Sequence, residues 1–279
     1  MNPLNNVWRY MIRRPLWVRL FSFALTLVVL WLPIGLTIFF LWGEGGTASF
    51  VNMGLLYLIF IFLLRVWGQR VHQQRSPLGF YGLQGGWQFG RDALWGWLLG
   101  VGLVALLFFI EGLLGWVQWQ GAPDQLGILL VEGLATGIGV GFAEELLFRG
   151  WLLQELELEY QPWFALGLNG IIFAVLHYLH PPEVIRATWP RFFGLVVLGL
   201  TLGLGKWVFG RRLGFPMGFH GGLVWAYFGV KVGDLVSYTG VMPEWVTGIS
   251  GNPIAGVMGV GMLLVVTLLL GYRAAATAP

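Results

Sequence analysis

Three ionisable side chains lie close together inside a long apolar stretch of the chain. Glu144, Glu145 and Arg149 belong to the segment 131–153, which reads VEGLATGIGVGFAEELLFRGWLL. A charged side chain inside a bilayer costs about 2.5–3.5 kcal/mol on insertion scales, so such residues usually form a functional site or a buried ion pair. A glutamate of this kind can act as a general base that takes a proton from water.

Helical geometry predicts different roles for the two glutamates. Every fourth residue of the segment belongs to one row along a helix: Gly133, Gly137, Gly141, Glu145 and Arg149. Glycines at this spacing let another helix approach closely, and Glu145 and Arg149 have the i,i+4 spacing of an ion pair. Glu144 points about 100° away from the row. We therefore expect Glu145 to stabilise the helix and Glu144 to do the chemistry, with a purely structural ion-pair network as the alternative.

Two of the four histidines lie in apolar segments that follow the acidic pair. His177 lies in IIFAVLHYLH and His220 in PMGFHGGLVWAY. Histidine can bind a metal, act as a base or donate a hydrogen bond to an oxyanion, although a single histidine on an apolar face is more often a hydrogen-bonded core residue. We expect His72, in a basic loop, to be solvated, and His180, which precedes two prolines, to end a helix.

The composition indicates the class of protein that must position these residues. The chain has 279 residues, of which 57% are hydrophobic and 10% charged, and its mean hydropathy is +0.74. Soluble chains contain about 25% charged residues, so the composition is that of a polytopic membrane protein. The absence of cysteine excludes thiol nucleophiles, disulfides and thiolate metal sites. The net charge of +3 is attributed to loop arginines and not to a nucleic-acid surface.

Hydropathy predicts an all-α, polytopic transmembrane helical bundle. A spanning helix needs about 20 mostly apolar residues, and eight segments come close to this length, the fifth to seventh being short. They are 17–42, 50–67, 93–118, 126–152, 163–179, 192–209, 215–231 and 254–272.

Basic residues predict the orientation of the bundle. They gather on alternate sides of the predicted spans: Arg9, Arg13, Arg14 and Arg19 before the first, Arg65, Arg70, Arg75 and Arg91 after the second, Lys206, Arg211 and Arg212 around the end of the sixth, and Arg273 in the tail. By the positive-inside rule both termini are cytoplasmic. We expect an integral protein of a bacterial cytoplasmic-type membrane.

Three motifs of the chain resemble those of the CPBP family, which comprises the type II CAAX prenyl endopeptidases and their bacterial Abi relatives. EELLFR (144–149) matches EExxxR, FAVLH (173–177) matches FxxxH, and FH followed by GG (219–222) is similar to the start of the third motif. The resemblance implies a four-helix intramembrane protease core over residues 125–235. The remainder divides into three N-terminal spans at 1–120 and a C-terminal loop and last span at 236–279.

The third motif departs from the family's pattern. It often reads HxxxN or HxxxD, whereas Val224 stands four residues after His220 and has no polar side chain. We expect Trp225, Asn169 or a backbone group to supply the missing hydrogen bond if the chain is active.

The resemblance implies an intramembrane endopeptidase with a cavity open to the cytoplasmic side. Glu144 and His177 would activate a water, His220 would donate to the oxyanion, and Glu145 with Arg149 would hold the fourth span in place. Alternatively, Glu144, His177 and His220 would bind one divalent metal such as zinc, since the residues permit either mechanism.

The expected partners are membrane lipids and a hydrophobic peptide or membrane-protein substrate, with no nucleic acid. A catalytically silent relative that acts as a membrane scaffold or binding protein is the first alternative, which Val224 favours. A small ion-coupled transporter is the second, against which the lack of inverted repeats counts.

Depth along the helices is the main geometric difficulty. If Trp151 and Trp163 mark the inner interface, a rise of 1.5 Å per residue puts Glu144 ~10 Å and His177 ~21 Å deep. Straight, upright helices would therefore keep these side chains apart. We expect tilt, or a fifth helix that begins later, to close ~10 Å.

Overall fold

The computed structural model describes residues 10–43 and 45–277 and confirms the all-α prediction. Arg9, which contributed to the orientation argument, lies outside the described residues. The chain divides into two compact units, of which the first ends at Tyr81 and the second begins at Gly82. The third predicted span, assigned from the sequence to the N-terminal segment 1–120, belongs to the second unit.

The first unit is a helical hairpin. It contains α2 (Leu16–Trp42), α3 (Gly46–Arg70) and the short α4 (Pro77–Phe80). The Phe23 ring of α2 packs edge-on against Phe60 and Trp67 of α3. Most other apolar side chains of α2 are exposed, as expected for a helix in contact with lipid.

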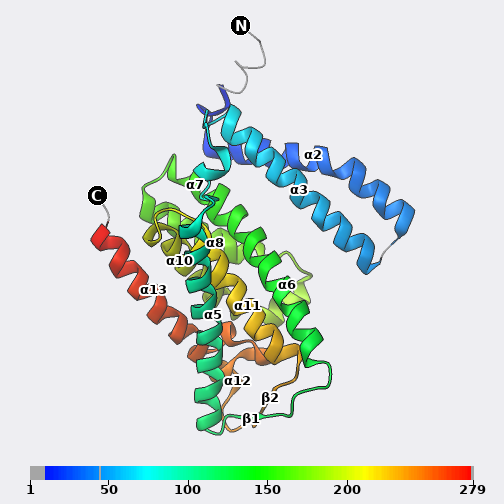
Figure 1. The fold of residues 1–279 in the computed structure, drawn as a ribbon, viewed down its shortest axis with the longest axis vertical. Coiled ribbons are helices and arrows are strands. Elements are labelled where there is room, and N and C mark those ends of the chain that lie inside the picture. Colours follow the sequence, from blue (N-terminus) through cyan, green and yellow to red (C-terminus); the bar gives the residue numbers. More distant parts are fainter. Residues whose placement is uncertain (1–9, 44, 278–279) are drawn as a thin grey trace. The chain divides into compact units, whose positions relative to one another are not determined.

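The second unit is a helical bundle that contains all the predicted site residues (Figure 1). Its helices are α5 (Trp87–Leu113), α6 (Leu126–Glu145), the π-helical η1 (Leu146–Leu152), α7 (Leu153–Glu157), α8 (Pro162–Leu176), α9 (Pro182–Thr188), α10 (Arg191–Val208), α11 (Gly214–Val232) and α13 (Val257–Thr277). Strand β1 (Val117–Trp119) pairs antiparallel with β2 (Val236–Tyr238). Between β2 and α13 lie α12 (Glu244–Thr247) and two 3₁₀ turns, η2 (Ile249–Gly251) and η3 (Pro253–Ala255).

Each of the eight predicted spans overlaps a helix, although the third, 93–118, runs past the end of α5 into β1. Among the described residues, six helices are long and apolar enough to cross a membrane by length and composition: α2, α3, α5, the continuous α6–η1–α7, α10 and α13. Helix α8, with 15 residues, is a shorter apolar helix, and α11, with 19 residues, falls outside that set.

The glycine row of α6 is where α11 packs, which confirms the predicted close approach of a second helix. A Cβ on Gly137 would lie 2.5 Å from the carbonyl oxygen of Gly221, and one on Gly141 would lie 2.6 Å from that of Met217. These distances are shorter than real Cβ contacts, so only glycine fits. Backbone contact between α6 and α11 therefore sets the position of His220 relative to the acidic pair.

Helix α5 packs against another face of α11 by the same means. A Cβ on Gly100 would lie 2.5 Å from the carbonyl oxygen of Phe219. At the end of the bundle where α11 begins, Arg212 donates two hydrogen bonds to Asp92 of α5, from Nε at 2.8 Å and from Nη2 at 2.6 Å. Arg211 pairs with Glu157 of α7. Ion pairs thus connect the loop before α11 to both α5 and α7.

The glycine packing predicts a contrast between two positions on α6. Gly141→Ala should destabilise the protein by roughly 1–3 kcal/mol, because the new methyl group overpacks the contact with α11. Gly139→Ala is the matched control, since a Cβ there meets nothing within 4 Å. Thermal unfolding in detergent, followed by tryptophan fluorescence, measures both variants. Equal melting temperatures would contradict this account of the helix contact.

Candidate active site

The fourth span changes its helical form directly after the acidic pair. Helix α6 ends at Glu145, and the chain continues as a π-helix from Leu146 to Leu152. π-Helices are rare and occur frequently at functional sites. Sequence reasoning treated the whole segment as an α-helix and missed this element, because no local residue pattern signals it.

Side chains from neighbouring helices satisfy backbone carbonyls of the π-helix. Lys206 Nζ donates to the Arg149 carbonyl oxygen at 2.6 Å, and Asn169 Nδ2 donates to that of Phe148 at 2.8 Å. The counting of Lys206 among the orientation charges was therefore wrong, because the side chain is fully buried in α10. Asn169 is likewise committed to the core and does not replace the polar side chain missing at Val224.

Glu145 forms the predicted ion pair with Arg149 and a second contact that was not predicted. Glu145 Oε1 lies 2.8 Å from Arg149 Nη1 and 2.9 Å from His220 Nδ1. Glu145 and Arg149 are fully buried. Arg149 also donates from Nη2 to the Gly199 carbonyl oxygen of α10 at 3.2 Å. A carboxylate can only accept, so His220 Nδ1 carries the proton and Nε2 of the neutral ring is left with a lone pair.

Glu144 points away from this pair and faces His177. Glu144 Oε2 lies 3.6 Å from His177 Nε2, and the side chains are 29% and 31% exposed, respectively. The distance is too long for a direct hydrogen bond. His177 Nδ1 lies 2.7 Å from the Phe173 carbonyl oxygen, an acceptor, so in the neutral ring Nδ1 carries the proton and Nε2 presents a lone pair to Glu144.

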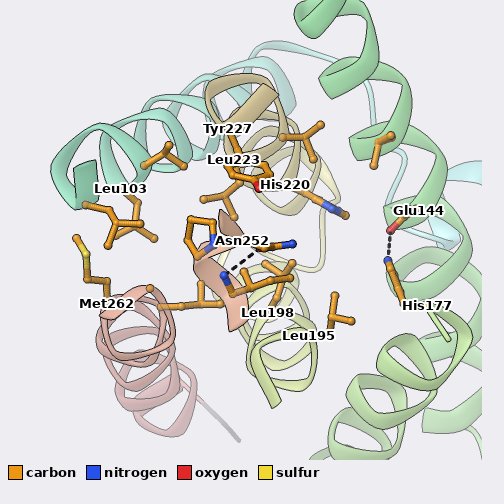
Figure 2. A pocket seen from close by; sticks show the side chains of 18 of the residues that line it. Leu103, Glu144, His177, Leu195, Leu198, His220, Leu223, Tyr227, Asn252 and Met262 are labelled. Atoms are coloured by element: carbon orange, nitrogen blue, oxygen red, sulfur yellow. Dashed lines mark hydrogen bonds and ion pairs between the residues drawn. The ribbon is translucent and has the colours of Figure 1, made fainter. Parts of the chain in front are cut away.

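Glu144, His177 and His220 line one cavity of about 280 Å³ (Figure 2). Val224 also lines this cavity. Most of the remaining lining is apolar and comes from α5, α10, α11 and α13: Leu103, Val104, Leu107, Leu195, Leu198, Leu223, Met262 and Leu263. The cavity therefore places five polar side chains, the glutamate and the two histidines together with Tyr227 and Asn252, on an otherwise largely apolar surface.

The predicted difference in depth between Glu144 and His177 disappears because one interface marker was wrong. Trp151 is buried, with 7% of its surface exposed, and the helix runs on to Glu157. Counted from Glu157, Glu144 lies at most ~20 Å along the helix, since the π-helix rises less per residue, and this is comparable with the ~21 Å for His177. The later start predicted for the fifth helix does not occur, because α8 begins at Pro162.

The other histidines and Trp225 are not among the residues that line this cavity. His72 is buried at 7% exposure and packs against the Phe80 ring in the first unit, so its expected solvation was wrong. His180 is exposed in the turn after α8. Trp225 donates from Nε1 to the Leu130 carbonyl oxygen at 2.9 Å and is not among the residues that line the cavity. It does not supply the polar group missing at Val224.

The predicted zinc site needs at least three ligand side chains that lie close together. Within residues 10–43 and 45–277, no group of three or more His, Cys, Asp or Glu side chains could hold a metal ion. The arrangement of Glu144, His177 and His220 therefore does not form a three-ligand site, and the metal stays a prediction.

The fold and site define a polytopic membrane protein with a glutamate and two histidines around a cavity between its helices. Residues 126–226 match the type II CAAX prenyl endopeptidase Rce1-like family. This match confirms the family resemblance of the segment. The apolar helices make the chain an integral membrane protein. No match to a curated protein or to a solved structure was found.

The two adjacent glutamates should respond differently to the same substitution. Glu145→Gln removes the partner of a fully buried arginine, a change that costs about 3–5 kcal/mol when a buried pair is broken. Among the described residues Glu144 Oε2 has no hydrogen-bond partner, so Glu144→Gln should leave the melting temperature close to that of the wild type. Thermal unfolding in detergent compares the two variants. Equal destabilisation would contradict the assignment of Glu145 as the structural member.

Proposed function

We propose that the protein is an intramembrane endopeptidase that hydrolyses a peptide bond of a hydrophobic or membrane-associated substrate. The observation that carries the proposal is the facing pair of Glu144 Oε2 and His177 Nε2, 3.6 Å apart, on two partly exposed side chains that line an apolar cavity. The family match of residues 126–226 supports the same class of reaction.

The hydrogen-bonding character of the pair supports activation of a water molecule. Both Glu144 Oε2 and the neutral His177 Nε2 are acceptors, so a water between them donates one hydrogen to each. The water oxygen then has its lone pairs free to attack a carbonyl carbon. The Phe173 carbonyl oxygen fixes the His177 ring in the tautomer that this requires.

Glu144 serves as the general base and then as the general acid. It takes one proton from the water while the oxygen forms a bond to the carbonyl carbon of the substrate. When the carbon–nitrogen bond breaks, the protonated carboxyl gives that proton to the leaving amine. The products are a carboxylic acid and an amine, and Glu144 returns to its ionised form. A positioned base of this kind contributes about 10²–10⁴-fold to the rate.

Glu145 and Arg149 position the groups around this reaction. Their ion pair holds His220 through the Glu145–His220 hydrogen bond, so the imidazole has a fixed orientation at the cavity wall. His220 donates to an oxyanion only when it is protonated, because the proton of the neutral ring is on Nδ1. In the neutral form it accepts a hydrogen bond from the substrate or from water.

The composition of the cavity supports an apolar substrate, and the basic loops support the orientation. The leucine-rich walls match a hydrophobic segment better than a charged one. Arg211 and Arg212 lie in the loop that precedes α11. By the positive-inside rule this end of the bundle faces the cytoplasm, with both termini on the same side.

The catalytically silent alternative has one observation in its favour. Val224 lines the cavity one helical turn after His220 and supplies no hydrogen bond there. If the protein is catalytically silent, the cavity would bind an apolar partner without cleaving it.

A cleavage assay in reconstituted membranes tests the proposal. The wild type, Glu144→Ala and His177→Ala are incubated with two quenched fluorescent probes, a farnesylated CAAX peptide and an unmodified apolar helical peptide. We expect the wild type to cleave at least one probe and both variants to lose about 100-fold or more of that rate.

Two further outcomes decide between the alternatives. A wild type that cleaves neither probe, or equal rates for the three proteins, would contradict the endopeptidase proposal. Adding a membrane-permeant chelator separates the two mechanisms. An unchanged wild-type rate supports the metal-free reaction, and loss of the wild-type activity supports the predicted divalent metal.

A further inference from the structure

We infer that Asn252 is a further site residue, which donates a hydrogen bond to the carbonyl oxygen of the peptide in the cavity. This inference rests on the proposed endopeptidase function. Asn252 lies outside the segment 126–226 that matches the family, between the 3₁₀ turns η2 and η3 that precede α13. It nevertheless lines the same cavity as Glu144 and His177 (Figure 2).

The orientation of the Asn252 amide follows from one backbone hydrogen bond. The Ile254 N–H donates to Asn252 Oδ1 at 3.2 Å. A backbone N–H can only donate, so the atom that it meets is the amide oxygen, and the NH₂ group takes the other direction. Among the described residues no acceptor is recorded for Nδ2, and Figure 2 shows the amide extending into the cavity.

The cavity wall otherwise lacks a neutral donor. The Nδ1 protons of His177 and His220 are engaged by Phe173 and Glu145, so both rings present lone pairs when neutral. The Tyr227 hydroxyl donates to the Gly251 carbonyl oxygen at 2.9 Å. Of the described side chains that line the cavity, Asn252 therefore offers the uncommitted N–H donors.

A donor of this kind is what the proposed reaction requires. Attack on a carbonyl places negative charge on its oxygen, and a fixed N–H aimed at that oxygen stabilises the transition state. Glu144 and His177 cannot fill this role, because both act on the water as acceptors. An amide donor needs no change of protonation state.

Close backbone packing fixes the position of Asn252. The Ile254 carbonyl lies against Gly194 of α10, and the Pro253 carbonyl lies against Gly259 of α13, each with no room for a side chain on the glycine. The segment is thus held between two helices that also line the cavity. A donor held in this way does not have to reorganise during the reaction.

Two variants separate the donor from the local structural role of Asn252. Asn252→Asp and Asn252→Ser both keep a side-chain oxygen that can accept from the Ile254 N–H, and both lose the NH₂ group. The serine hydroxyl is still a donor, but it is one bond shorter and does not reach the position of Nδ2. One introduces a charge and the other does not. They are compared with the wild type and Glu144→Gln in the proteoliposome assay, with the probe that the wild type cleaves, and their thermal unfolding is measured in detergent.

We expect kcat to fall about 100-fold in both variants, with smaller changes in KM and with melting temperatures close to the wild-type value. Wild-type kcat in either variant would overturn the inference. So would a loss confined to Asn252→Asp, which would assign the effect to the new charge, or a loss that follows a lowered melting temperature.

Glu144→Gln distinguishes failure of this inference from failure of the proposed function. If Glu144→Gln is inactive and the Asn252 variants are fully active, only the inference about Asn252 fails. If Glu144→Gln cleaves as fast as the wild type, or if the wild type cleaves neither probe, the endopeptidase proposal fails and the inference fails with it.

Discussion

One carboxylate oxygen connects the two helices on which the site depends. Glu145 Oε1 accepts from Arg149 on its own helix and from His220 on α11. Because Glu145 and Arg149 are fully buried, their charges must compensate each other, and the histidine takes up the remaining acceptor capacity of the same atom. One arrangement therefore forms the ion pair, joins α6 to α11 and orients the His220 ring. Glu144 takes no part in these contacts.

The glycines make this arrangement possible. The Glu145–His220 contact requires α6 and α11 to approach at backbone distance, which the absence of side chains at Gly137 and Gly141 permits. Hydrogen bonds inside a bundle then add to packing that is already close. The backbone contact between α6 and α11 thus determines where the polar atoms of Glu145 and His220 lie.

Periodic features could be read from the sequence, whereas long-range contacts could not. Apolar runs predicted the helices, and i,i+4 spacing predicted the glycine face and the Glu145–Arg149 pair. The burial of Lys206 was missed because its acceptor, the Arg149 carbonyl, becomes available only where the helix changes form. Asn252 was not among the predicted site residues, since nothing near it in the chain indicates that its loop folds back against the cavity. The depth of Glu144 was predicted wrongly because the sequence does not distinguish a tryptophan in the core, such as Trp151, from one at the membrane interface.

The π-helix changes which way the fourth span faces along its length. A π-turn takes more residues than an α-turn, so the row that leads from Gly133 to Arg149 does not continue on the same side beyond η1. Before the change, the helix presents glycines to α11; after it, Leu153 packs near Leu166 of α8 and Gly203 of α10. A single continuous helix thereby acts as two packing surfaces with different partners. Glu144 and Glu145 stand at the junction between them, where one chain segment can serve both the interior of the bundle and its cavity.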